Sequence, residues 1–394
     1  MRIGRWARLL LLGVPLLAGC KGFWNPISSS SSGTGATGSV FYVLNQQTSQ
    51  LAAYSIVKGT LTPLNGSPFT LPSGPYAIAV APNNAFLYVS TATGIYLYSI
   101  GTGGVPALAS STPVASDTAA YALQVDSTDS WLLEASGVGY LYAIPISPAN
   151  GTVSATATEQ HVALSSNSPQ KMAISPDNKY VFVAMGNAGT AVVSFTAANT
   201  DPLPSAISTV IAVMGTGGAA VSVAVDPSAT PRLFYIGEVA VTSGSSNTGG
   251  LRAFSYSSLS GTLTEVSGSP YASGGLAPYS ILPTPYSTSP GAYIYVANRT
   301  VSGSTTGNIC GFALTSTGTT YTLTALTTTA SAGTYPVSLA QDATGNYVLA
   351  VDSGGGPDLE AYTFDSTTAG KLDSAFTSST GTDPVGAIAI AAAP

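Results

Sequence analysis

Short strand-like stretches with alternating apolar and polar residues recur along the chain, each beside a polar turn. One example is SPDNKYVFVAMG (residues 175–186), in which a turn precedes a predicted strand. Comparable phrases are PYAIAVAPNNAFLYVS, AYALQVDSTDSWLLEA and YPVSLAQDATGNYVLAV. The unit repeats every 45–58 residues, with turns at Pro82, Ser127, Pro176, Pro227, Pro285 and Ala343. A repeat of this length built from strands predicts the blades of a β-propeller.

Each unit contains four predicted strands. A second strand such as FLYVS or YVFVA follows the turn, a third such as GIYLYSI or LEAYTF comes next, and a fourth such as GKLDSAF ends the unit. The chain begins with FYVLN, a second strand without a first, and ends with PVGAIAIAAAP, a first strand with nothing after it. Joining these ends predicts an all-β, seven-bladed propeller of four-stranded blades over residues 39–394, with the ring closed by the C-terminal strand. The alternative is an open array of sheets, which would leave strand edges unpaired.

The N-terminus has the features of an export signal. MRIGRWARLLLLGVPLLAGC contains three Arg residues, then an apolar run over residues 9–17, then small residues before Cys20. That run is about half of the roughly 20 residues that span a bilayer. Leu17-Ala18-Gly19-Cys20 looks like the lipobox of bacterial lipoproteins, so we expect a signal peptide at residues 1–19 and an acylated Cys20 that anchors the chain to a membrane. The alternative is an ordinary export signal with a chance cysteine.

A Ser- and Gly-rich stretch, residues 20–38, follows the signal and is predicted to be a flexible tether. Lys21 in place of Asp after Cys20 favours the outer membrane by the sorting rule of enterobacterial lipoproteins. The remaining cysteine, Cys310, lies in the apolar stretch NICGFAL and is predicted to be a buried hydrophobe rather than a reactive thiol.

Charge excludes one class of partner. Charged residues make up 7% of the chain, with 11 Lys and Arg against 17 Asp and Glu, and no basic cluster is present to neutralise phosphates. Nucleic-acid binding is therefore not expected. Without the three Arg of the signal, eight basic residues face 17 acidic ones, a formal charge of −9 that would repel anionic substrates.

The phrases SPDNKYVFVA, LYVSTATGIYLYSI and YIYVANR resemble those of the seven-bladed lactonase-type propellers. That family includes the bacterial 6-phosphogluconolactonases, the fungal carboxy-muconate cyclases and the related YVTN-repeat surface proteins. The resemblance covers residues 39–394 and implies a fold more specifically than an activity, because propellers host many unrelated functions.

Family chemistry uses His, Glu and Arg residues at one mouth of the central channel. The resemblance places Glu238 in FYIGE and Arg299 in YVANR at matching positions and so implies a catalytic pair. The family's His-Pro-His, however, aligns with Ser168-Pro169-Gln170, and its Pro-Arg-His aligns with Ala220-Val221-Ser222. The imidazole that usually carries protons near neutral pH is therefore missing.

His161, in ATEQHVAL, is the only histidine and is predicted to lie on a fourth strand at the outer edge of a blade. No cofactor is expected. Oxygen ligands for calcium exist in DSGGGPDLE, where Asp352, Asp358 and Glu360 lie close in sequence, but solvated acids in a Gly-rich loop are the preferred interpretation, so no metal is predicted.

The residues that close the second strands are mostly polar and should lie on one face of the ring. We expect them to form a binding rim around the channel mouth, although strand ends are also polar simply because turns begin there. The polar members are Asn45, Thr91, Ser136, Glu238, Asn298 and Asp352.

Two functions follow from these patterns. The missing histidine and low charge favour a lipid-anchored, non-catalytic binding or scaffold module at the bacterial envelope, a monomer that binds an envelope protein or a polysaccharide. The alternative is an exported lactonase-like hydrolase that uses Glu238 and Arg299 at the channel mouth.

Overall fold

The structure is a computed structural model. It describes residues 38–115, 119–153, 159–166, 168–228, 232–241, 249–284, 292–378, 383–384 and 386–393. The expected signal peptide, Cys20, almost all of the tether, and the turn at Pro285 lie outside these ranges. Within them the chain is all-β, as predicted, and its one helical element is a single 3-10 turn, η1 (Thr102–Gly104).

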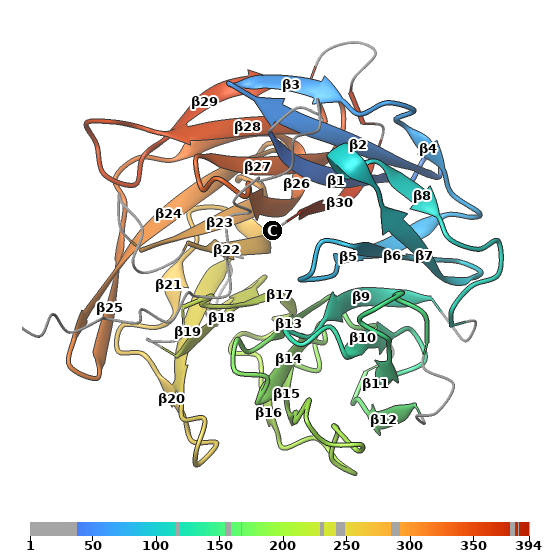
Figure 1. The fold of residues 1–394 in the computed structure, drawn as a ribbon. Coiled ribbons are helices and arrows are strands. Elements are labelled where there is room, and N and C mark those ends of the chain that lie inside the picture. The colour runs from blue at the N-terminus through green and yellow to red at the C-terminus, as the bar shows by residue number, and fades with distance from the viewer. Residues whose placement is uncertain are drawn as a thin grey trace, which may run out of the picture.

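Antiparallel sheets stand side by side around a common centre (Figure 1). Three four-stranded sheets consist of β5 (Pro75–Val80), β6 (Phe86–Thr91), β7 (Gly94–Ile100) and β8 (Pro106–Leu108); of β9 (Ala120–Val125), β10 (Trp131–Ser136), β11 (Tyr140–Pro145) and β12 (Gln160–Ala163); and of β13 (Lys171–Ile174), β14 (Tyr180–Ala184), β15 (Thr190–Ser194) and β16 (Thr209–Ile211). A further sheet contains β17 (Ala220–Val225), β18 (Leu233–Glu238), β19 (Gly250–Tyr256) and β20 (Leu263–Glu265), with β21 (Tyr271–Ala272) paired to β19. In each case the first strand lies nearest the centre.

Both ends of the described chain belong to one sheet. It contains β1 (Ser39–Asn45), β2 (Gln50–Val57), β3 (Thr60–Pro63) and β30 (Ala387–Ala392), with β4 (Phe69–Thr70) paired to β2. β1 pairs on one side with β2 and on the other with β30, for example Val43 with Ile390. The N-terminal strand therefore has no free backbone edge along this register.

One sheet is twice the predicted size. It holds β22 (Leu276–Pro283), β23 (Tyr293–Thr300), β24 (Thr306–Thr317), β25 (Thr320–Ala325), β26 (Ala330–Gln341), β27 (Tyr347–Gly354), β28 (Leu359–Phe364) and β29 (Leu372–Thr377). Two four-stranded units merge here because the start of β26 pairs with β24, as in Ile309 with Ala330. The rest of β26 then pairs with β27, so one long strand belongs to both units.

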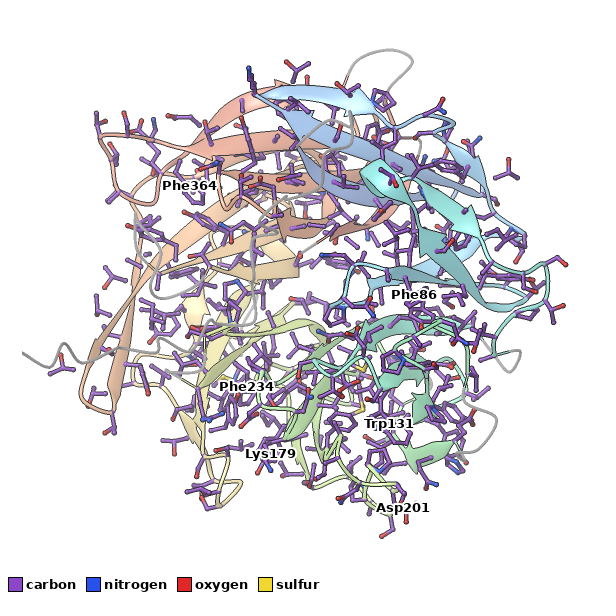
Figure 2. The ribbon with its side chains drawn as sticks, in the orientation of Figure 1. Phe86, Trp131, Lys179, Asp201, Phe234 and Phe364 are labelled. Atoms are coloured by element: carbon purple, nitrogen blue, oxygen red, sulfur yellow. The ribbon has the colours of Figure 1, made fainter. Side chains whose placement is uncertain are left out.

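The core lies between neighbouring sheets. Phe182 of β14 stacks on Phe234 of β18 with ring centroids 4.1 Å apart. Figure 2 shows Phe234 and Trp131 among the strands, with the charged Lys179 and Asp201 at the periphery. The facing surfaces of adjacent sheets are thus buried against each other. This burial is the main source of hydrophobic stabilisation in this arrangement.

The recurring polar turn joins the first two strands of a sheet and also contacts the neighbouring sheet. In SPDN, Asn178 adopts a left-handed φ of 51°, which Asn tolerates, and Ser175 Oγ accepts the amides of Lys179 and Tyr180 at 3.0 and 2.9 Å. Asn178 Nδ2 donates to Ser127 Oγ at 2.7 Å, in the equivalent turn of the preceding sheet. The repeated phrase therefore closes a hairpin and fixes one sheet against the next.

Candidate functional site

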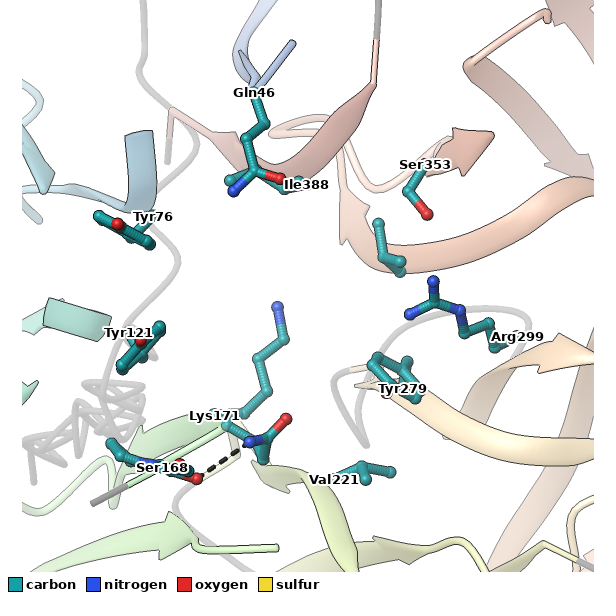
Figure 3. Close-up of a pocket in the computed structure, with 13 residues that line it drawn as sticks. Gln46, Tyr76, Tyr121, Ser168, Lys171, Val221, Tyr279, Arg299, Ser353 and Ile388 are labelled. Atoms are coloured by element: carbon teal, nitrogen blue, oxygen red, sulfur yellow. Dashed lines mark hydrogen bonds between the residues drawn. The ribbon is translucent and has the colours of Figure 1, made fainter. Parts of the chain in front are cut away.

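A pocket of about 450 Å³ lies at the centre of the molecule, where the innermost strands of the sheets converge (Figure 3). Its wall is built from every sheet. The side chains that give it chemical character are Tyr76, Tyr121, Ser168, Lys171, Tyr279 and Arg299.

β-bulges aim side chains into this pocket. In six innermost strands one residue is skipped in the pairing register at or near the end of the second strand that it faces, as Tyr76 is between Pro75 and Ala77. A bulge leaves its extra residue unpaired and turns the side chain out of the ladder. The skipped residues all line the pocket, and they are Tyr76, Tyr121, Val221, Tyr279, Val337 and Ile388.

The six residues of the predicted polar rim do not line the pocket. They pair with the residue beside each bulge, as Asn298 does with Pro278. None is solvent-facing, since the exposed fractions of Asn45, Thr91, Ser136, Glu238, Asn298 and Asp352 are 0–3%. After three of these six residues, the next residue along the chain lines the pocket instead, because successive strand side chains alternate. Gln46, Arg299 and Ser353 are these residues.

Glu238 forms a buried ion pair rather than a site with Arg299. Its Oε1 lies 2.9 Å from Nη1 of Arg252, and its Oε2 accepts the amide of Met214 at 3.0 Å. Arg252 also binds both carboxylate oxygens of Glu265 at 2.9 Å. Glu238 is not among the pocket-lining residues, so the structure does not bring the expected catalytic pair together. Arg252 lies on the neighbouring strand β19, and the sequence analysis did not identify it as a partner of Glu238.

Arg299 is held in place by aromatic rings. Its guanidinium carbon lies 5.0 Å from the ring centroids of both Tyr279 and Tyr335. Cation–π contacts of this kind fix the orientation of a guanidinium while leaving its N–H donors available to a ligand. Among the residues that the structure describes, no Asp or Glu forms an ion pair with it.

Lys171 is the second basic group. It begins β13, and its side chain extends into the middle of the pocket (Figure 3). No acidic partner lies within ion-pair distance in the described part of the chain. Burial lowers the pKa of Lys171 below its ordinary value, since the charged ammonium is poorly solvated there.

The pocket therefore has local electrostatics opposite to those of the whole chain. Lys171 and Arg299 face it and no Asp or Glu among the described residues lines it, whereas the chain carries a formal net charge of −6. The expectation that overall charge would repel anions does not apply at this point, because nearby charges in a recess dominate the local potential. Tyr76 and Tyr121 pack edge to face, 5.4 Å apart, and add an aromatic wall.

A cluster of acids lies outside the pocket lining, at β27 and β28 of the eight-stranded sheet. Asp352 and Asp358 are 0% and 2% exposed, which corrects the expectation of solvated acids in a loop. Burial, together with Glu360, Asp358 and Asp383, raises the pKa of Asp352 to about 8. Within the described ranges, no group of three or more His, Cys, Asp or Glu is arranged to hold a metal ion.

The remaining two candidate residues occupy the predicted environments. His161 is exposed on β12, the edge strand of its sheet, against the rings of Tyr140 and Tyr142. Cys310 is a free, buried cysteine, and burial raises the pKa of its thiol to about 11. A neutral buried thiol is a poor nucleophile.

Comparison with known proteins gives a fold. No protein-family model matches the chain. No curated protein matches it in sequence. Solved structures do match. A protein from Lactobacillus plantarum has a TM-score of 0.64 at 16% identity, and the periplasmic gluconolactonase of Pseudomonas aeruginosa 0.63 at 15%; each match covers 90% of this chain and 99% of the other.

The fold is a β-propeller, similar to that of the periplasmic gluconolactonase. Hydrazine synthase of Kuenenia stuttgartiensis also matches, with a TM-score of 0.54 at 15% identity, over 79% of this chain and 91% of that one. At such identities the likeness concerns the propeller fold alone. In the described part of the propeller, no helix has the length and apolar character needed to span a bilayer.

Proposed function

We propose that this protein is an exported, non-catalytic binding module whose central pocket takes a small anionic ligand. The observation that carries the proposal is a pocket that holds two basic side chains, Lys171 and Arg299, and in which no described residue supplies an acidic partner or an acidic lining group. Burying unpaired charges is costly, so an arrangement of this kind is typical of a site that is completed by a ligand.

A carboxylate attached to a sugar ring or similar ring fits the chemistry. The fork of Arg299 suits two parallel hydrogen bonds to a carboxylate, and the Tyr76–Tyr121 wall offers flat apolar surface to a ring. Small-ligand pockets generally combine such surfaces with a few polar groups that fix orientation. A volume of about 450 Å³ is ample for one sugar acid.

The architecture of the module belongs to the proposal. Counting the eight-stranded sheet as two units gives seven blades. Contacts between successive innermost strands, from β5 through β9, β13, β17, β22 and β26 to β30 and back to β5, support a closed ring. The β1–β30 pairing supports closure by the C-terminal strand.

Export and anchoring rest on the sequence. Residues 1–19 are the proposed signal peptide, Cys20 the acylated anchor and residues 20–38 the tether that holds the propeller near the outer membrane. The module is then a monomer at the cell envelope, and its ligand is a free sugar acid or the acidic unit of an envelope polysaccharide or protein.

The alternative is a lactonase at the channel mouth. The fold likeness to a periplasmic gluconolactonase and the position of Arg299, which suits a developing oxyanion, favour it. Against it, no histidine lines the pocket, and Glu238 would have to leave Arg252 to act beside Arg299.

Titration calorimetry of the full chain separates the two functions. D-gluconate and D-galacturonate are compared with neutral D-glucose, and proton release from glucono-lactone is followed in parallel. The proposal expects binding of the acids only, loss of that binding in Arg299→Ala, unchanged binding in the surface control Lys179→Ala, and no turnover. Equal binding of glucose and the acids would contradict the binding function, and turnover abolished by Arg299→Ala would establish the lactonase.

A further inference from the structure

The two basic groups of the pocket are chemically different. An arginine stays protonated at any physiological pH, whereas a lysine amine becomes an effective nucleophile once its proton is lost. Arg299, fixed between Tyr279 and Tyr335, already supplies a permanent positive charge. Lys171 differs, because its burial disfavours the ammonium form and so favours the neutral amine.

The surroundings of Lys171 leave its amine free to react. No Asp or Glu within the described residues pairs with it, so nothing nearby stabilises the ammonium. The polar atoms of its neighbours are partly engaged with one another, as Gln170 Nε2 donates to the carbonyl oxygen of Ser168 at 2.9 Å. Figure 3 shows the Lys171 amine and the Arg299 guanidinium directed into the same space from different sheets.

We infer that Lys171 forms a reversible imine with a ligand that carries both a carbonyl group and a carboxylate, such as a 2-oxo acid or the open-chain form of a uronic acid. The inference rests on the proposed anion-binding function and names the ligand class of the same pocket. Arg299 holds the carboxylate, and the carbonyl carbon is presented to Lys171.

The chemistry balances without any further reagent. The lone pair of the neutral amine adds to the carbonyl carbon, and a proton moves from nitrogen to the carbonyl oxygen, giving a carbinolamine. The hydroxyl group then leaves as water by taking the second proton of the nitrogen while the C=N bond forms, and addition of water reverses the sequence. No oxidant or reductant takes part, so the step amounts to reversible covalent capture.

Reductive trapping tests this inference on the full chain. The protein is incubated with glyoxylate near neutral pH, treated with cyanoborohydride and digested, and the adduct on each lysine peptide is measured by mass spectrometry. Lys179, which is exposed, reports the background reactivity of an ordinary lysine.

We expect a several-fold excess of adduct on the Lys171 peptide over the Lys179 peptide. Lys171→Arg keeps a positive charge but cannot form an imine, so it abolishes the excess, whereas the matched Lys179→Arg leaves it unchanged. Arg299→Ala lowers the adduct from glyoxylate more than that from acetaldehyde, which has no carboxylate.

The outcomes separate this inference from the proposed function. Equal labelling of Lys171 and Lys179 in a protein that still binds D-gluconate would overturn imine formation and leave anion binding intact. Equal labelling together with no gluconate binding would overturn both. Circular dichroism of each variant shows whether the propeller remains folded.

Discussion

The central pocket and the Asp352 cluster include neighbouring residues of one strand, β27, but one is basic and open whereas the other is acidic and buried. Lys171 and Arg299 face an open pocket to which the described part of the chain contributes no acid, while Asp352 is fully buried beside three other carboxyl groups. Asp352 closes a second strand, and Ser353, one residue further on, faces the pocket. One step along a strand therefore separates a structural position from a candidate ligand contact, because successive side chains point to opposite sides.

The largest expected effect comes from the buried side of this comparison. Because the native pKa of Asp352 is raised to about 8 from an ordinary value near 4, the native state holds a proton that the unfolded chain loses. The favourable contribution of the protonated carboxyl to the free energy of unfolding is complete below about pH 4 and is lost as pH rises to about 8. In Asp352→Asn, the decrease in the free energy of unfolding between about pH 4 and pH 8 should be smaller by several kcal/mol. Urea unfolding at several pH values across that range measures it. An unchanged slope would mean that Asp352 is already ionised in the native state.

Glu238 provides the next test, since it combines a buried position with an expected catalytic role. Glu238→Ala should lower the free energy of unfolding by about 3 kcal/mol, because the buried Arg252 loses one of its carboxylate partners. D-gluconate affinity, measured at a temperature where the variant is folded, should not change. Weaker gluconate binding with unchanged stability would instead assign Glu238 to the site.

Arg299→Ala addresses the pocket side directly. Losing a charge-assisted contact to a carboxylate should weaken D-gluconate binding by about 2 kcal/mol, roughly 30-fold, as measured by calorimetry. The free energy of unfolding should change little, since the guanidinium has no ion-pair partner among the described residues. A large loss of stability would show that Arg299 serves the fold.

The smallest effect concerns the ring that holds Arg299. Tyr335→Leu removes one of the two cation–π contacts and should weaken D-gluconate binding by about 0.5–1 kcal/mol. Tyr347→Leu is a matched control, because Tyr347 contacts Phe376 and not the pocket. Equal effects of the two substitutions would indicate a general loss of packing.

The fold was largely predictable because the same local sequence patterns recur in every unit. The recurring turn, the alternating strands and the surplus strand at the C-terminus predicted an all-β chain whose last strand lies beside its first, and β30 pairs with β1. The merger of β24 with β26 was not predictable, since no break or charge in TTTASAGTYPV distinguishes an outer strand from the inner strand that continues it.

The site was only partly predictable. Arg299 was found through a family motif, and it lines the pocket. Lys171 and the bulged tyrosines were missed because the strand pattern locates a face but does not reveal a one-residue insertion in the register. One signal in the sequence could have identified the tyrosines. Tyr76 and Tyr279 each follow a proline of the first strand, and this proline pairs with a residue near the end of the second strand. Both tyrosines are large aromatic residues at a position where a buried strand would carry a small side chain.

The central claim is that ligands bind in the pocket beside Arg299 rather than at the buried Glu238. Calorimetric titration of D-gluconate into the full chain, Arg299→Ala and Glu238→Gln tests it directly. We expect binding to the unaltered protein and to Glu238→Gln with equal affinity, and a loss of roughly 30-fold in Arg299→Ala. Binding that survives Arg299→Ala but disappears in a folded Glu238→Gln would place the ligand site at Glu238 instead.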